Sequence, residues 1–166
     1  MFIEIDKKTY IEANDILYIF SSKKNTSINS LKKEAKKNKV YFGKMDGYET
    51  LIVTKNKTIF AVNYKTKDII KKCNLYNHKM LVVSNDYYIA VPYIDALVDL
   101  DSPLASGQNQ ITKATDSLQL VYQGERRKSV AMMKTKEIVY LSKDSEELVN
   151  SVSGGIEDTF GKKAKK

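Results

Sequence analysis

The sequence feature that most constrains the fold is a hydrophobic pattern that occurs twice. Residues 50–63, TLIVTKNKTIFAVN, align without a gap with residues 129–142, SVAMMKTKEIVYLS, at an offset of 79 residues. Each segment has two apolar clusters around a short turn that contains lysines, which is typical of a β-hairpin. The pattern therefore predicts one structural unit that is present twice.

A second pair of segments supports this repeat. Residues 2–20, FIEIDKKTYIEANDILYIF, align with residues 80–98, MLVVSNDYYIAVPYIDALV, at an offset of 78, and Tyr10 then aligns with Tyr88. A loop in the middle of the unit can absorb the one-residue difference between the offsets. The alternative is two unrelated stretches that are rich in strands, because alternation of apolar and polar residues is common.

The repeat predicts an α+β protein built from two tandem, similar units. Each unit is expected to be a mainly antiparallel β-sheet with one or two short helices. The first unit covers residues 1–73 and the second residues 80–152, with a linker at 74–79 and a flexible basic tail at 153–166. Units of this size bury little surface alone, so we expect them to pack on each other or on other chains.

The individual elements follow from periodicity and turn residues. In the first unit we predict strands at 2–6, 9–13, 16–20, 40–43, 50–54 and 58–62, and a helix at 65–72. In the second unit we predict strands at 80–84, 87–91, 94–98, 118–122, 129–133 and 137–141, and helices at 109–117 and 144–152.

A lysine-rich segment after the third strand predicts a further helix. Ser27 or Asn29 is suited to cap it by accepting bonds from free backbone N–H groups. Ile28, Leu31 and Ala35 are spaced at i, i+3 and i+7 and form a narrow apolar stripe. Lysines occupy much of the remaining surface, so the helix is expected to present a basic face.

Composition argues against several classes of function. The sequence has one cysteine, Cys73, and one histidine, His78, so an internal disulfide is impossible and a zinc site is not expected. No glycine-rich phosphate loop or catalytic triad pattern is present. We therefore predict no metal, no cofactor and no enzymatic activity. With no apolar stretch that would serve as a signal or a membrane span, we expect a soluble, cytoplasmic protein without a membrane partner.

The net charge of +8 is distributed unevenly. Residues 1–79 have 17 lysines and 8 acidic residues, a net charge of +9, whereas residues 80–152 have a net charge of −3 and residues 153–166 one of +2. Such asymmetry indicates that the two halves have different roles, and the basic half suggests an anionic partner.

Two basic clusters are the candidate binding sites for double-stranded DNA. The first is on the predicted helix and the second precedes the repeated hairpin; their members are Lys32, Lys33, Lys36 and Lys37, and Arg126, Arg127 and Lys128. Clustered lysines bind phosphates by releasing condensed counterions, and arginine adds bidentate contacts. The alternative is that the lysines form a solvated face and the arginines an ordinary surface loop.

The order of these segments resembles the small bacterial Rem proteins, which regulate extracellular-matrix genes. The resemblance covers residues 1–73 and 80–152, and includes FIEIDKKTYIEANDILYIF, SLKKEAKKNKV and VPYIDALVDLDSPLASGQNQ. It implies a DNA-binding protein without enzymatic activity that assembles into closed rings, with DNA on a basic outer surface. The family's basic cluster before the hairpin corresponds to Arg126, Arg127 and Lys128, whereas the same place in the first unit has only Lys44.

The resulting functional hypothesis is a DNA-binding homo-oligomer, acting as a transcriptional regulator or as an architectural protein. It would contact the phosphate backbone. The alternative is a structural or interaction module of the same fold that has lost DNA binding and binds a protein partner.

Overall fold

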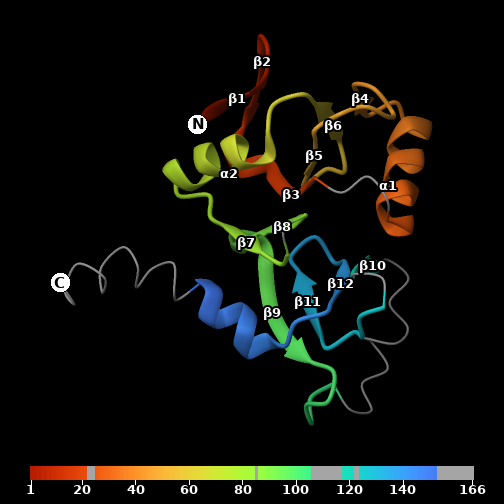
Figure 1. The fold of residues 1–166 in the computed structure, drawn as a ribbon, viewed down its shortest axis with the longest axis vertical. Coiled ribbons are helices and arrows are strands. Elements are labelled where there is room, and N and C mark those ends of the chain that lie inside the picture. The colour runs from red at the N-terminus through yellow and green to blue at the C-terminus, as the bar shows by residue number, and fades with distance from the viewer. Residues whose placement is uncertain (22–24, 85, 106–116, 122–123, 153–166) are drawn as a thin grey trace, which may run out of the picture. The chain divides into compact units, whose positions relative to one another are not determined.

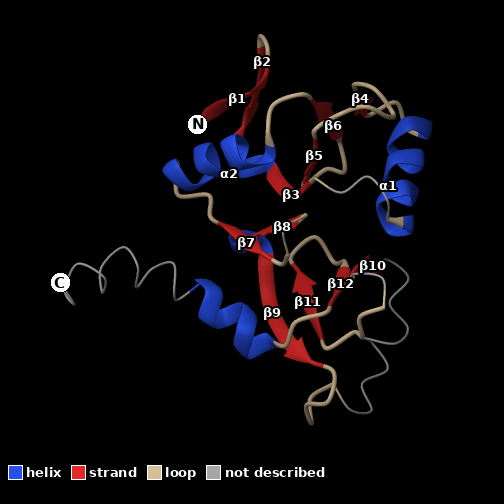
Figure 2. Cartoon of the chain, in the orientation of Figure 1, coloured by secondary structure: helices blue, strands red, loops and turns tan. Residues whose placement is uncertain are grey.

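Strands dominate the chain and helices separate them, as the ribbon in Figure 1 and the colours of Figure 2 show. The structure, a computed structural model, describes residues 1–21, 25–84, 86–105, 117–121 and 124–152. Its class is α+β with sheets that are mainly antiparallel, which confirms the predicted fold class.

The chain divides into two compact units, and each is described by itself. Unit 1 comprises Met1–Met80 and Ser84–Ile94, and unit 2 comprises Leu81–Val83 and Asp95–Lys166. The residues from 84 to 94, which the sequence repeat placed in the second segment, therefore lie in unit 1.

The elements of the first part of the chain are close to those expected from its periodicity. They are β1 (Phe2–Asp6), β2 (Thr9–Glu12), β3 (Ile16–Phe20), α1 (Thr26–Lys37), β4 (Tyr41–Phe42), β5 (Thr50–Thr54), β6 (Ile59–Val62), α2 (Thr66–Leu75), β7 (Met80–Val82) and β8 (Tyr87–Ala90). A short 3-10 helix, Ala13–Asp15, joins β2 to β3 and was not predicted.

The later elements are β9 (Ile94–Asp99), β10 (Ser117–Leu120), β11 (Ser129–Met133) and β12 (Ile138–Leu141). A 3-10 helix, Val91–Tyr93, precedes β9, and residues 145–152 are helical. The helix predicted at 109–117 lies outside the described residues except for Ser117, which belongs to β10 because its backbone pairs with β12. The predicted tail at 153–166 also lies outside them.

Four neighbouring strands of the larger sheet have the same order as the four strands of the smaller sheet. The larger sheet has the order β4-β6-β5-β3-β8-β7 and the smaller one has the order β10-β12-β11-β9. In both, the hairpin is antiparallel (β5 with β6, β11 with β12) and a short strand pairs in parallel with its second strand (β4 with β6, β10 with β12). The parallel pairs were not predicted. β1 and β2 form a separate two-stranded sheet.

The two hairpin turns have the same hydrogen bonds. In the first, the N–H groups of Thr54 and Lys57 donate to the carbonyls of Thr58 and Thr54, each at 2.9 Å. At an offset of 79, Met133 donates to Glu137 at 3.1 Å and Lys136 donates to Met133 at 2.9 Å. Lys57 and Lys136 both have positive φ, 69° and 80°. The similarity of the two sequences therefore extends to their backbone geometry.

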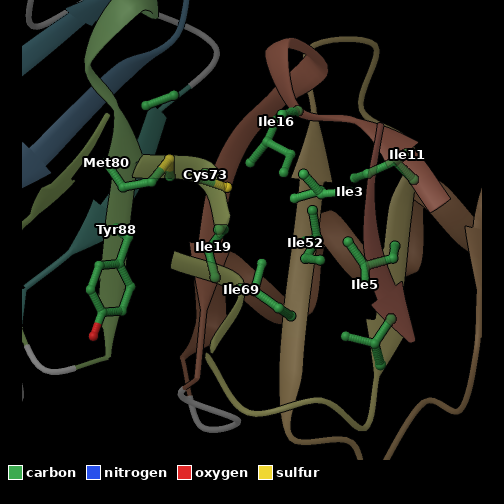
Figure 3. Packing of buried hydrophobic residues seen from close by; sticks show 13 residues of the cluster. Ile3, Ile5, Ile11, Ile16, Ile19, Ile52, Ile69, Cys73, Met80 and Tyr88 are labelled. Carbon is green, nitrogen blue, oxygen red and sulfur yellow. The ribbon is translucent and has the colours of Figure 1, made fainter. Parts of the chain in front are cut away.

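The core of unit 1 lies between the β1–β2 hairpin, the larger sheet and α2, and Figure 3 shows its apolar side chains. Its buried members are Ile3, Ile5, Ile11, Ala13, Ile16, Ile19, Ile52, Val62, Ile69, Cys73, Met80, Tyr88 and Ala90. Burial of Cys73 raises the pKa of its thiol to about 12. The thiol therefore stays protonated at neutral pH and unreactive in the folded protein.

His78 provides a prediction about pH. The side chain is buried, and its Nε2 lies 2.7 Å from the carbonyl oxygen of Ile16. Burial lowers the pKa of His78, because the charged ring is poorly solvated there. Protons then bind more tightly to the unfolded chain, whose histidine has a pKa near 6.5. The free energy of unfolding should fall as the pH drops below about 6.5, by at most about 1.4 kcal/mol per pH unit for one group.

Urea denaturation of the wild type and of a His78→Phe variant at pH 7.5 and pH 5.5 measures this effect. We expect a smaller loss of stability between the two pH values in the variant. Equal losses in both proteins would show that other groups account for the pH dependence.

Candidate nucleic-acid interface

Helix α1 begins earlier than the sequence suggested. Asn25 caps it, and its Oδ1 accepts hydrogen bonds from the backbone N–H groups of Ser27 at 2.9 Å and Ile28 at 3.3 Å. The prediction of Ser27 or Asn29 as the cap is therefore wrong. An asparagine at this position satisfies two N–H groups that the first helical turn leaves free.

The buried face of α1 includes a lysine. Its buried residues are Ile28, Lys32 and Ala35, whereas Leu31 is half-buried. The Nζ atom of Lys32 donates to the carbonyl of Met45 at 2.7 Å and to the hydroxyl of Tyr48 at 3.2 Å. It also lies 4.8 Å from the centre of the Tyr48 ring, a cation–π contact. With only 5% of its surface exposed, Lys32 does not lie on the exposed face of α1.

The other three lysines of the predicted cluster are exposed and lie together. Lys33, Lys36 and Lys37 occupy neighbouring turns of α1 at spacings of three and four, so they share a surface turned away from Ile28. Lys36 and Lys37 are in the last turn, where the helix dipole favours positive charge. Like charges at this spacing repel each other mildly, and an anion bound between them would relieve that repulsion.

The second predicted cluster lies in unit 2, in the loop that leads into β11. Gly124 has φ of +86°, and Arg126, Arg127 and Lys128 are all exposed. Two hydrogen bonds fix the backbone of Lys128. Its N–H donates to the carbonyl of Leu141 at 2.8 Å, and its carbonyl accepts from the N–H of Leu100 at 3.0 Å. The strands therefore hold the cluster at one place while its side chains remain accessible.

The surroundings of Arg126, Arg127 and Lys128 reduce the attraction of this cluster for a phosphate. The guanidinium carbon of Arg127 lies 4.3 Å from the centre of the Tyr140 ring, so this side chain is held on an aromatic face. The cluster borders a surface hollow of about 480 Å³ that also contains three carboxylates; its charged lining residues are Asp99, Asp101, Asp144, Arg126, Arg127 and Lys128. The carboxylates reduce the positive potential that a phosphate would meet.

A further basic surface was not identified from the sequence as a site. A hollow of about 610 Å³ on unit 1 is lined by Asn63, Tyr64, Lys65, Asp68, Lys71 and Lys72. Lys72 is already engaged, because its Nζ donates to the carbonyl of Glu4 at 2.9 Å and lies over the ring of Tyr64. The sequence showed these lysines only as part of a general enrichment, since nothing in their spacing separates them from a solvated face.

Within the part of the chain that the structure describes, no group of three or more histidine, cysteine, aspartate or glutamate side chains is arranged to hold a metal ion. No described helix combines the length and the apolar character needed to cross a bilayer.

No protein-family model and no curated protein sequence matches this chain.

Proposed function

We propose that the protein is a non-enzymatic, cytoplasmic DNA-binding protein that contacts the phosphate backbone of duplex DNA through α1. The observation that carries this proposal is the exposed group of Lys33, Lys36 and Lys37 on one helix, in a half of the chain with a net charge of +9. Such a group binds phosphates with little dependence on sequence, because its affinity comes from the release of condensed counterions.

The loop of unit 2 has the secondary role in this proposal. Arg126 and Lys128 are exposed and can reach phosphates, whereas Arg127 is stacked on Tyr140. The nearby carboxylates oppose an anion, so we place the larger share of affinity on α1.

The proposal extends to regulation and assembly. The resemblance to the Rem proteins, together with the matching strand orders of the two sheets, supports a tandem-repeat protein that forms rings and acts in transcription or in DNA architecture. A protein-binding module of the same fold is the second candidate, and it is favoured by the carboxylates beside Arg126 and Arg127.

Salt dependence tests the proposed role of α1. A variant with Lys33→Ala, Lys36→Ala and Lys37→Ala should bind duplex DNA more weakly, and the slope of log K against log salt should decrease by about one unit for each lysine removed, about three in all. Fluorescence anisotropy with a labelled duplex, at salt concentrations from about 50 to about 300 mM, measures this slope.

A second triple variant provides a control matched in charge. Lys67, Lys71 and Lys79 are also exposed and lie outside α1, so replacing them with alanine removes the same charge. We expect its slope to stay near that of the wild type. Equal slopes in all three proteins would contradict the role of α1, and wild-type protein that does not bind duplex at low salt would favour the protein-binding module.

A further inference from the structure

One pairing of a hairpin strand with the edge of a sheet, here called a strand junction, is formed within the described part of the chain. β8 pairs antiparallel with β3 in unit 1, with Ile19 opposite Tyr88 and Phe20 opposite Tyr87. Beyond this ladder, Ser21 donates from its N–H to the carbonyl of Asp86 and from its Oγ to the Asp86 carboxylate, both at 2.9 Å. A hairpin strand has thus been added to the edge of a sheet, and every residue of β3 and β8 is buried.

The two partners of this junction have counterparts elsewhere in the chain. At an offset of 78 residues, β2 corresponds to β8, and the 3-10 helices and the starts of β3 and β9 correspond as well. Among the described residues, however, β9 is the last strand of its sheet, and β2 pairs only with β1. The described part of the chain therefore contains one filled junction and both halves of an unfilled one.

Burial differs between the two hairpins as an unfilled junction requires. Tyr88 is 9% exposed and Met80 is 7% exposed, whereas their counterparts Tyr10 and Phe2 are 60% and 70% exposed. β9 is only partly covered along its length, although its counterpart β3 is fully buried. Exposed apolar strand edges of this kind promote association with another strand.

We propose that β2 of one copy pairs antiparallel with the β9 edge of a second copy. The register transferred from the filled junction places Tyr10 opposite Leu97 and Ile11 opposite Ala96 of the other copy. Tyr10 and Phe2 would then become covered as Tyr88 and Met80 are.

The charges at the end of this ladder are complementary. The contact between Ser21 and Asp86 corresponds, at the same offset, to a contact between Asp99 of one copy and Lys8 of the other. Ser21 and the acidic Asp86 of the filled junction are thus replaced by the acidic Asp99 and the basic Lys8 in the proposed one. Opposite charges at this place favour the pairing and its register.

The contact joins two different surfaces, so it is heterologous. Each copy has one β1–β2 hairpin and one β9 edge, and copies associate head to tail until the series closes or continues as a filament. This inference specifies the partner surface for the assembly proposed above. It does not depend on DNA binding, since none of the exposed lysines of α1 takes part.

Two variants that each block one half of the junction test the proposal. Tyr10→Asp places a charge on the hairpin and Leu97→Asp places one on the β9 edge. By light scattering without DNA, we expect wild-type protein to form oligomers and each variant alone to be monomeric. Tyr76→Asp, at another exposed tyrosine, should leave the oligomers intact.

Mixing the two variants gives the decisive result. Each retains the half that the other has lost, so an equimolar mixture should form a heterodimer of twice the monomer mass and nothing larger. This outcome also shows that both variants fold. A monomeric wild type, or folded variants that remain oligomeric alone, would overturn the proposal.

A cysteine pair provides a test without a charged substitution in a strand. Side chains directly opposite in a ladder lie on one face, with Cβ atoms about 4.5–5.5 Å apart. Tyr10→Cys combined with Leu97→Cys should form disulfide-linked oligomers on mild oxidation, and native Cys73 is fully buried and should not compete. In the control pair, Tyr10→Cys with Val98→Cys, the second thiol points to the other face of the sheet. Far fewer disulfide-linked oligomers should then form. Equal cross-linking in both pairs would contradict the register.

Discussion

A Gly43→Ala substitution is expected to destabilise the protein by roughly 3 kcal/mol, which combines the usual costs of a disfavoured φ and of overpacking. Gly43 follows β4 and has φ of +112°. A Cβ atom added there would lie 2.2 Å from the carbonyl oxygen of Ala61 and 3.0 Å from its Cβ. That oxygen belongs to β6, a strand paired on both sides, so it cannot move without disturbing the sheet.

Gly47 offers a matched control for this change. It also has positive φ, +81°, but nothing lies within 4 Å of an added Cβ atom. Gly47→Ala should therefore cost only about 1–2 kcal/mol, the cost of the backbone conformation. Urea denaturation of both variants against the wild type measures the difference. Equal destabilisation would show that the contact with Ala61 has no effect on stability.

The strands were the most predictable part of this fold. β1, β3, β5 and β11 have the bounds that alternation and turn residues indicate, and the hairpin turns occur where lysine-containing loops separate β-branched runs. These features are local, because each depends on residues within about ten positions. The fold class follows from their order.

The pairing of distant strands could not be predicted in the same way. β8 begins 67 residues after β3 ends, and no property of Tyr87–Ala90 distinguishes pairing with β3 from pairing within the second segment. Parallel pairing of β4 with β6 also depends on where the connecting chain places a two-residue strand. Hydrophobic pattern specifies which residues are buried, and the chain's path specifies their neighbours.

The sequence predicted only part of the candidate site, because the surroundings of one lysine depend on residues outside its helix. The sequence placed four lysines on one helix, and three of them are exposed as a basic face requires. Lys32 differs because its partners, Met45 and Tyr48, lie 13 and 16 residues away, in a loop whose path a helical pattern does not describe. A lysine can bury its aliphatic stem and bring its ammonium to a buried acceptor, so its position on the apolar side of a helix was compatible with either environment.

This difference leads to a prediction for Lys32→Ala. The substitution removes two hydrogen bonds, the cation–π contact with Tyr48 and the packing of the stem, and leaves the carbonyl of Met45 without this donor. Loss of a donor to partly buried acceptors costs about 1–3 kcal/mol, and the missing packing adds to it, so we expect destabilisation of about 3 kcal/mol.

The neighbouring Lys33→Ala serves as the control, because it removes the same charge from an exposed position. Its stability should change by about 0.5 kcal/mol or less, as is usual for exposed sites. The two variants should also differ in DNA binding, and there Lys33→Ala should have the larger effect. Lys33→Ala should lower the salt slope by about one unit, whereas folded Lys32→Ala should keep the slope of the wild type. A reduced slope for Lys32→Ala, without loss of stability, would place Lys32 in the DNA contact and contradict its structural role.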